Sequence, residues 1–272
     1  MRHHLQSFPF DQSSPFDQAG MNTFMEQSGT VAATLVVPAN RSHPFYPVDL
    51  RVPGYIATST PTAVLLTIFF GGLLMLITTT RYFLRGLKPQ LSNGDTWTAT
   101  WFVICGFIHS LLEGYFSWHS LQMGGRTDLF GQLWKEYSLS DSRYMTQDSF
   151  VVCMETVTAV LWGPLSFLCA YMIVTDHTAR HSVQLTVSFG QLYGLILYFA
   201  TCTFEELVHG VVLSHPAPIY FWAYYITCNA FWLFIPGWLI YQSLGEVQAA
   251  FAYKAQFNAV ARQQMRKEAA TL

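Results

Sequence analysis

The chain has 272 residues, of which 51% are hydrophobic and only 11% are charged. A soluble domain usually has roughly a quarter of charged residues, so this chain carries too few charges to cover a soluble surface. We therefore expect the lipid bilayer to be its main solvent. The net charge of −2 provides no basic field of the kind that binds nucleic acid, which argues against a nucleic-acid partner.

Residues 1–56 are predicted to form a polar N-terminal arm. They include six prolines, which suit a flexible or surface-lying segment: Pro9, Pro15, Pro38, Pro44, Pro47 and Pro53. The arm begins without the apolar core of a cleavable signal peptide, so membrane insertion would depend on internal helices. Asn40 opens an Asn-Arg-Ser glycosylation sequon, which matters only if this side is lumenal.

Five apolar segments follow, each close to the roughly 20 residues that a membrane-spanning helix needs. We expect them over residues 61–80, 97–119, 149–174, 183–204 and 219–243. Arg81 and Arg85 are expected to close the first. The pattern predicts an all-α integral membrane protein: a five-transmembrane-helix bundle over residues 57–245 with a membrane-embedded ligand cavity. A cytosolic helical tail over residues 246–272 would follow it.

Topology is predicted from the positive charges in the loops. Lys and Arg are slightly more frequent on the side that holds the first loop, the third loop and the C-terminal tail. Cytosolic loops carry an excess of these residues. We therefore predict a cytosolic C-terminus and a lumenal N-terminus.

Two features of the apolar segments are interpreted as packing. The five cysteines all lie in apolar runs without a CxxC pair, so we expect buried small side chains and neither disulfides nor a zinc site. Gly190 and Gly194 have the small-xxx-small spacing that lets helices approach closely. We interpret this spacing first as packing between helices and second as a dimerisation surface. Pro164 is expected to kink the third span.

Three ionisable side chains lie well inside predicted spans: His109, Glu113 and Glu155. An ionised carboxylate at the bilayer centre costs about 2.5–3.5 kcal/mol even on the lenient insertion scale. His109 and Glu113 are four residues apart and share a helix face. One such pair could be a structural hydrogen bond, but two buried carboxyls and a His on separate helices favour groups that hold and release protons.

Further polar and aromatic side chains accompany these groups. Thr158 and Trp162 follow Glu155 on the third span, and Tyr225, Asn229 and Trp232 are spaced i, i+4 and i+7 on the fifth. A lone Asn or Thr is usually a contact between helices, and a lone Trp is usually an interfacial anchor. Together they predict a substrate-binding, cation-stabilising lining.

The chemistry that fits such a cavity is proton addition and proton removal on an apolar substrate. The sequence contains no nucleophile elbow, phosphate loop, dinucleotide fingerprint or metal cluster, so we expect no cofactor and no metal. An indole face can stabilise a carbocation without attacking it. Protonation, a cation and deprotonation elsewhere amount to a double-bond isomerisation.

Residues 134–144 read "WKEYSLSDSRY" and mix positive and negative charges. We interpret this segment as a solvated loop held by salt bridges. The alternative is a lid that orders the mouth of the bundle or meets the hydroxyl group of a substrate.

Five stretches of the sequence resemble the emopamil-binding protein family of sterol Δ8–Δ7 isomerases. The likeness runs in order over about residues 60–245 and leaves out the N-terminal arm. The matching stretches are "CGFIHSLLEGYF" (105–116), "QLWKEYSLSDSRY" (132–144), "VCMETVTAVLWGPLS" (152–166), "GQLYGLILYF" (190–199) and "HPAPIYFWAYYITCNAFWLFIPG" (215–237).

The resemblance implies a five-helix bundle in the endoplasmic reticulum membrane, often dimeric, with a sterol cavity open toward the bilayer. The family's functional residues fall on His109, Glu113, Glu155, Thr158, Asn229 and Trp232. The family's members are thought to protonate a ring olefin and to lose a proton from a neighbouring carbon. Leu195 stands where the family commonly has an acidic residue.

The leading hypothesis is therefore a sterol isomerase, for which lipophilic amines would be inhibitors. A sibling enzyme that isomerises or cyclises another polycyclic terpenoid is a second hypothesis. A non-catalytic protein that binds sterols and cationic amphiphiles is a third. A proton-coupled transporter is a weaker fourth, because five helices without an inverted repeat do not resemble a secondary transporter.

Overall fold

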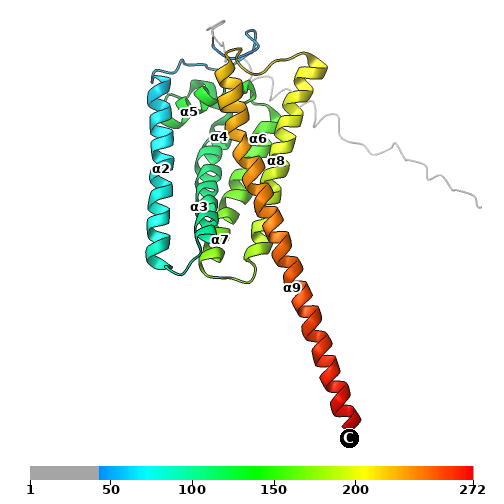
Figure 1. Ribbon diagram of the computed structural model, residues 1–272. Helices are drawn as coiled ribbons and strands as arrows, with labels where there is room; N and C mark the ends of the chain where they lie inside the picture. The colour runs from blue at the N-terminus through cyan, green and yellow to red at the C-terminus, as the bar shows by residue number, and fades with distance from the viewer. Residues whose placement is uncertain (1–42, 272) are drawn as a thin grey trace, which may run out of the picture. The chain divides into compact units, whose positions relative to one another are not determined.

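The computed structural model describes residues 43–271, and each regular element in this part of the chain is helical. Five helical stretches in it are long and apolar enough to cross a membrane, which confirms the predicted all-α, five-span fold. The stretches are Thr62–Leu87, Asn93–Gly125, Ser149–Val174, Arg180–His209 and Tyr220–Ala270. They lie side by side in one bundle, beyond which the last helix continues (Figure 1).

Two spans are single helices and three are composite. The first is α2 (Thr62–Leu87) and the fourth is α8 (Arg180–His209). The others are listed by their parts: α3 (Asn93–Phe107), η2 (Ile108–Glu113), α4 (Gly114–His119) and η3 (Ser120–Gly125); α6 (Ser149–Val157), η5 (Thr158–Trp162) and α7 (Gly163–Val174); and η6 (Tyr220–Cys228) with α9 (Asn229–Thr271).

The three segments η2, η5 and η6 are π-helical, each inside or at the start of a span. A π turn contains one residue more than an α turn, and such turns are frequent at functional sites. Pro164 lies in the first turn of α7, directly after η5, and has no N–H to donate to the preceding turn. The change from π to α helix falls at this proline, and the expected kink stays a prediction.

Helix α2 extends beyond the predicted end at residue 80, and Arg85 lies in its last turn, as expected. It runs on through Arg81 and Arg85 to Leu87. The guanidinium carbon of Arg81 lies 3.7 Å from the centroid of the Trp97 ring on α3. This cation–π contact joins the end of the first span to the start of the second, so the arginine belongs to the helix and not to the loop.

Close backbone approaches join the second and third spans. A Cβ atom added at Gly163 would lie 2.3 Å from the hydroxyl oxygen of Ser110, so only glycine fits there. The fourth and fifth spans are joined by polar contacts instead. Gln184 is fully buried on α8, and its Nε2 donates to the carbonyl of Leu239 (3.3 Å) and to Oε1 of Gln242 (3.0 Å), both on α9.

Residues 126–148, which we call the inner loop, are packed into the bundle. They contain α5 (Leu129–Tyr137) and the short helix η4 (Ser142–Met145). Lys135, Asp141 and Arg143 are at most 4% exposed. The prediction of a solvated loop is therefore wrong. Buried charged groups need ion-pair or hydrogen-bond partners inside the protein, and the fold supplies them.

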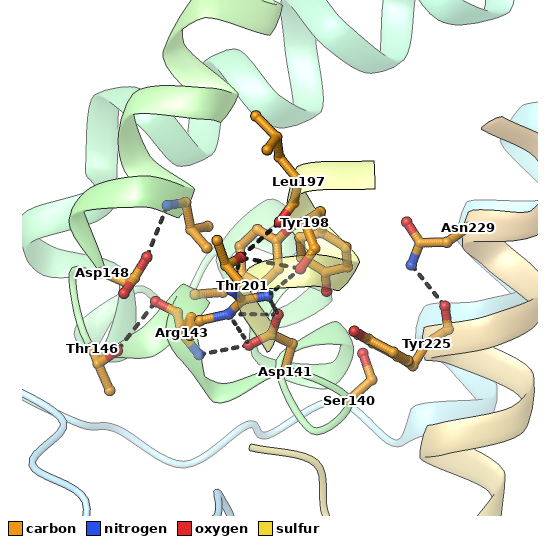
Figure 2. A network of polar contacts seen from close by, with 12 residues as sticks. Ser140, Asp141, Arg143, Thr146, Asp148, Leu197, Tyr198, Thr201, Tyr225 and Asn229 are labelled. Carbon is orange, nitrogen blue, oxygen red and sulfur yellow. Dashed lines mark hydrogen bonds and ion pairs between the residues drawn. The ribbon is translucent and has the colours of Figure 1, made fainter. Parts of the chain in front are cut away.

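An ion pair forms the centre of the inner loop (Figure 2). Arg143 Nη2 donates to Asp141 Oδ2 at 2.7 Å, and Arg143 Nη1 donates to the hydroxyl of Thr201 on α8 at 2.7 Å. Arg143 Nη2 also donates to the carbonyl of Tyr198 at 3.2 Å. Five-donor guanidinium groups suit such buried sites because every N–H can find an acceptor.

The segment before the first span is also part of the bundle's compact unit. Phe45 is 1% exposed in the core, and the amide of Ile56 donates to the carbonyl of Gly124 at 2.9 Å. Lys135 Nζ donates to the carbonyl of Ile56 at 2.7 Å. Residues 43–56, the end of the predicted N-terminal arm, thus pack on the bundle. Residues 1–42, with the sequon at Asn40, lie outside the described residues.

The C-terminal residues continue α9 without a break as far as Thr271. Helix α9 contains Pro236 and extends past the ends of the other helices (Figure 1). The predicted helical form of the tail agrees with this course, whereas its cytosolic location stays a prediction.

Loss of the Arg143 side chain should destabilise the fold. Arg143→Met leaves the fully buried Asp141 without its counter-charge, which costs about 3–5 kcal/mol. Thermal and denaturant unfolding of the detergent-solubilised protein measures this loss. The matched control is Arg126→Met, because the Arg126–Asp128 pair is about one-third exposed and should contribute no more than about 1 kcal/mol. Equal losses in the two variants would contradict this account of the inner loop.

Candidate functional site

A cavity of about 820 Å³ lies between the five spans and the inner loop. Its volume is in the range of small-molecule sites, about 300–1,000 Å³. Its wall is mostly apolar, and a minority of the lining side chains are polar. These are His109, Glu113, Glu136, Glu155, Thr158, Gln191, Asn229 and the hydroxyl-bearing Tyr137, Tyr144, Tyr193, Tyr198 and Tyr224.

His109 and Glu113 lie on the π-helical segment η2 and face the cavity together. His109 Nδ1 is 2.8 Å from Glu113 Oε2. On its other side, Nε2 of His109 is 2.9 Å from the amide nitrogen Nε2 of Gln191 on α8. The imidazole of His109 is thus held between a carboxyl group on its own span and a buried amide on the fourth span. Partners on both ring nitrogens fix the orientation of the histidine.

Glu155, on α6, is 5% exposed and accepts a hydrogen bond from the hydroxyl of Tyr144 at 2.7 Å. Burial, together with the nearby Glu155 carboxylate, raises the pKa of the Tyr144 phenol well above its usual value, so this hydroxyl stays a donor. Glu113 and Glu155 line the same cavity, where the charge of each carboxyl acts on the other. The three ionisable groups predicted from the sequence thus meet in one place.

The two predicted tryptophans line the same cavity from opposite helices. The Trp232 ring lies 6.3 Å from the imidazole of His109 and 5.6 Å from the ring of Trp101, between ring centroids. Trp162 lies against the backbone of α8 at Gly190, where an added Cβ would be 2.4 Å from its Cζ2 atom. Gly190 therefore leaves room for the Trp162 indole. Gly194, the other member of the predicted small-xxx-small pair, has nothing within 4 Å of an added Cβ, so the packing interpretation applies to Gly190 alone.

The remaining predicted residues differ in their placement. Thr158 lines the cavity, but its hydroxyl donates to the carbonyl of Met154 at 2.7 Å. Asn229 lines it as well, and its Nδ2 donates to the carbonyl of Tyr225 at 2.8 Å and to the hydroxyl of Tyr137 at 3.2 Å. Tyr225 is not among the lining residues; it is 7% exposed in the core behind the cavity.

Sequence reasoning missed two functional candidates, Gln191 and Tyr144, and reached Glu136 only through the alternative that its segment meets the hydroxyl group of a substrate. Gln191 was visible as an amide within an apolar span, where a polar side chain needs a partner. Tyr144 and Glu136 belong to the inner loop, and no local pattern marks that loop as buried. Among residues 43–271, His, Cys, Asp and Glu side chains do not gather in groups of three that could hold a metal ion.

Comparison with known proteins places the chain in a family. The model of the EXPERA family (expanded EBP superfamily) matches residues 129–243. The chain is 40% identical over 211 residues to the 3-beta-hydroxysteroid-Delta(8),Delta(7)-isomerase of Mus musculus. The aligned residues cover 76% of this chain and 90% of the mouse protein. The chain belongs to the EBP/EXPERA family.

Other members of the EBP/EXPERA family show its range. The isomerase of the same name from Rattus norvegicus is 42% identical over 205 residues, covering 74% of this chain and 87% of the rat protein. An isomeliandiol synthase of Melia azedarach is 33% identical over 164 residues, covering 60% of this chain and 75% of that protein. The family resemblance inferred from the sequence motifs is therefore confirmed.

The contact between Gly190 and the Trp162 ring provides a test of the cavity wall. Gly190→Ala places a methyl group within the indole ring and must displace it, at a cost of about 1–3 kcal/mol. We expect the cavity to bind an apolar ligand about tenfold or more weakly, while the protein still folds. Gly237→Ala is the matched control, because Gly237 is not among the cavity-lining residues and a Cβ there meets nothing within 4 Å. Affinities that fall equally in both variants would contradict this role of Gly190.

Proposed function

We propose that this protein isomerises the Δ8 double bond of a 3β-hydroxysteroid to Δ7 by protonation and deprotonation. The observation that carries the proposal is the meeting of His109, Glu113 and Glu155 in one largely apolar cavity. An apolar cavity accepts a carbon skeleton, and the only chemistry its ionisable groups offer is proton transfer. The names of the mouse and rat relatives support the sterol assignment.

In this proposal Glu113 delivers the proton. A protonated Glu113 gives its proton to one olefinic carbon, and the N–H of His109 Nδ1 stabilises the carboxylate that remains. The carbon skeleton then carries one positive charge, next to the carboxylates and the face of Trp232. A cation–π contact with an indole contributes about 0.5–2 kcal/mol, and more when it is desolvated.

Glu155 removes the second proton. Its carboxylate, steadied by the hydroxyl of Tyr144, takes a proton from a carbon next to the cation, and the electron pair of that C–H bond forms the new double bond. The substrate gains one proton and loses one, so the product is an isomer. Between turnovers Glu155 releases its proton to solvent and Glu113 takes one up from solvent, which resets the site.

The same proposal includes the setting and the ligands of the enzyme. We assign it to the endoplasmic reticulum membrane as a multi-pass protein, with the C-terminus in the cytosol and a homodimer as its assembly. Lipophilic amines that are protonated near neutral pH would resemble the carbocation and bind as inhibitors, since mimics of a high-energy intermediate bind tighter than substrates. Thr158, Asn229 and Trp162 would shape the cavity around the rings.

A second candidate is an isomerase of another polycyclic terpenoid. The likeness of the chain to an isomeliandiol synthase, 33% identical over 164 residues, favours it, because that relative is named for a different product. The two candidates share the proton chemistry and differ only in the skeleton that the cavity accepts.

Turnover in heavy water tests the proposed function. Purified protein given a Δ8-sterol should form the Δ7-sterol with one solvent deuterium on the carbon that was protonated, as read by mass spectrometry. Conversion of a polycyclic triterpenoid without conversion of the sterol would favour the second candidate. Binding of a lipophilic amine without turnover of either would indicate a non-catalytic binding protein, and a product without deuterium would contradict protonation.

Removal of either acid should abolish most of the activity. Glu113→Gln and Glu155→Gln keep the size of the side chain but cannot exchange a proton, so we expect kcat to fall about a hundredfold or more. Glu205→Gln is the matched control, because Glu205 forms an equivalent i, i+4 pair with His209 but is exposed and outside the cavity. Near-normal turnover in both cavity variants would refute the assigned roles.

A further inference from the structure

A third carboxyl group lines the cavity and takes no part in the proposed proton transfer. Glu136 lies at the end of α5, in the inner loop, and is 7% exposed. Burial of a carboxylate is costly unless its oxygens are fully hydrogen-bonded or paired with a cation. The contacts of Glu136 therefore need to be accounted for one by one.

Two neutral hydroxyls donate to this carboxylate. Thr62 Oγ1, at the start of α2, donates to Oε2 at 3.0 Å, and the hydroxyl of Tyr224, on η6, donates to Oε1 at 3.0 Å. A carboxylate has room for about four donors, so half of its capacity is unused. Within residues 43–271 it forms no ion pair, and the ammonium of neighbouring Lys135 donates to the carbonyl of Ile56 instead.

The cavity thus has two polar places with different partners. At one, Glu113 and Glu155 interact with each other, with His109 and with Tyr144. At the other, Glu136 lines the cavity, binds the hydroxyls of Thr62 and Tyr224, and has acceptor capacity left. A purely structural tie between the first and fifth spans would not need a charged residue that opens on the cavity. An incoming hydrogen-bond donor would complete it.

The ligand class of the proposed function carries one such donor, the hydroxyl group at C3. We propose that Glu136 accepts a hydrogen bond from the 3β-hydroxyl of the substrate. This bond determines which end of the sterol enters first, and so places the ring olefin at Glu113 and Glu155. The inference rests on the proposed function and names the residue that orients its substrate.

The bond is needed for orientation because the rest of the skeleton is apolar. Contacts with an apolar wall are non-directional and would admit the skeleton in more than one pose. A hydrogen bond to a charged acceptor has a direction, and a site built to satisfy a hydroxyl discriminates against an analogue without it. Glu136 is therefore a substrate-binding residue, whereas the proton-transferring groups remain Glu113 and Glu155.

The experiment compares a Δ8-sterol with its 3-deoxy analogue, in wild type and in variants of Glu136. In the wild type, kcat/KM should be about 10- to 100-fold lower for the 3-deoxy analogue, as for loss of a hydrogen bond to a charged group. Glu136→Met, which has no acceptor, should lower kcat/KM for the hydroxysterol to that of the analogue. Glu136→Gln retains one acceptor oxygen and should restore part of the discrimination.

The matched control is Thr62→Val, which removes the donor that ties Glu136 to α2 and leaves the carboxylate in place with the Tyr224 hydroxyl bound to it. It should keep the preference for the hydroxysterol. Loss of the preference in this variant, equal to that in Glu136→Met, would mean that Glu136 only ties the spans together and would overturn the inference.

Two wild-type outcomes separate the inference from the function on which it rests. Equal turnover of the hydroxysterol and the 3-deoxy analogue would overturn the role of Glu136 and leave the isomerase intact. Turnover of neither sterol would overturn the proposed function and the inference with it.

Discussion

The buried ion pair between Asp141 and Arg143 is the interaction on which the site depends. It fixes the short helix η4 against α8, because Arg143 also donates to Thr201 and to the carbonyl of Tyr198 (Figure 2). Tyr144 is the next residue on η4, and its hydroxyl donates to Glu155. Exposed ion pairs contribute little to stability. A loop held only by such pairs would not keep the Tyr144 hydroxyl in place against the buried Glu155 carboxylate.

The π-helical segments place the polar side chains toward the cavity. His109 and Glu113 lie on η2, Thr158 and Trp162 lie on η5, and Asn229 directly follows η6. An extra residue in a turn shifts the side chains that follow it relative to regular α-helical spacing. The span can therefore keep its apolar surface toward lipid while a short stretch aims its polar groups inward.

Local properties of the chain were sufficient to predict the five spans and the His109–Glu113 pair, since both depend on hydropathy and spacing within one helix. The expected alignment of Tyr225 with Asn229 assumed regular α-helical spacing, which η6 does not have. The burial of the inner loop and the partnership of Gln191 with His109 join residues far apart in the chain. Sequence spacing carries no information on such contacts, so they required the structure.

Helix α8 has a consequence for the biogenesis of the protein. Gln184 is fully buried on it, and the two recorded acceptors of its amide both lie on α9. Before α9 is synthesised, the fourth span would expose this amide to lipid, where unsatisfied polar groups are costly. The fourth and fifth spans should therefore leave the translocation machinery as a pair, which makes the bundle dependent on late steps of membrane insertion.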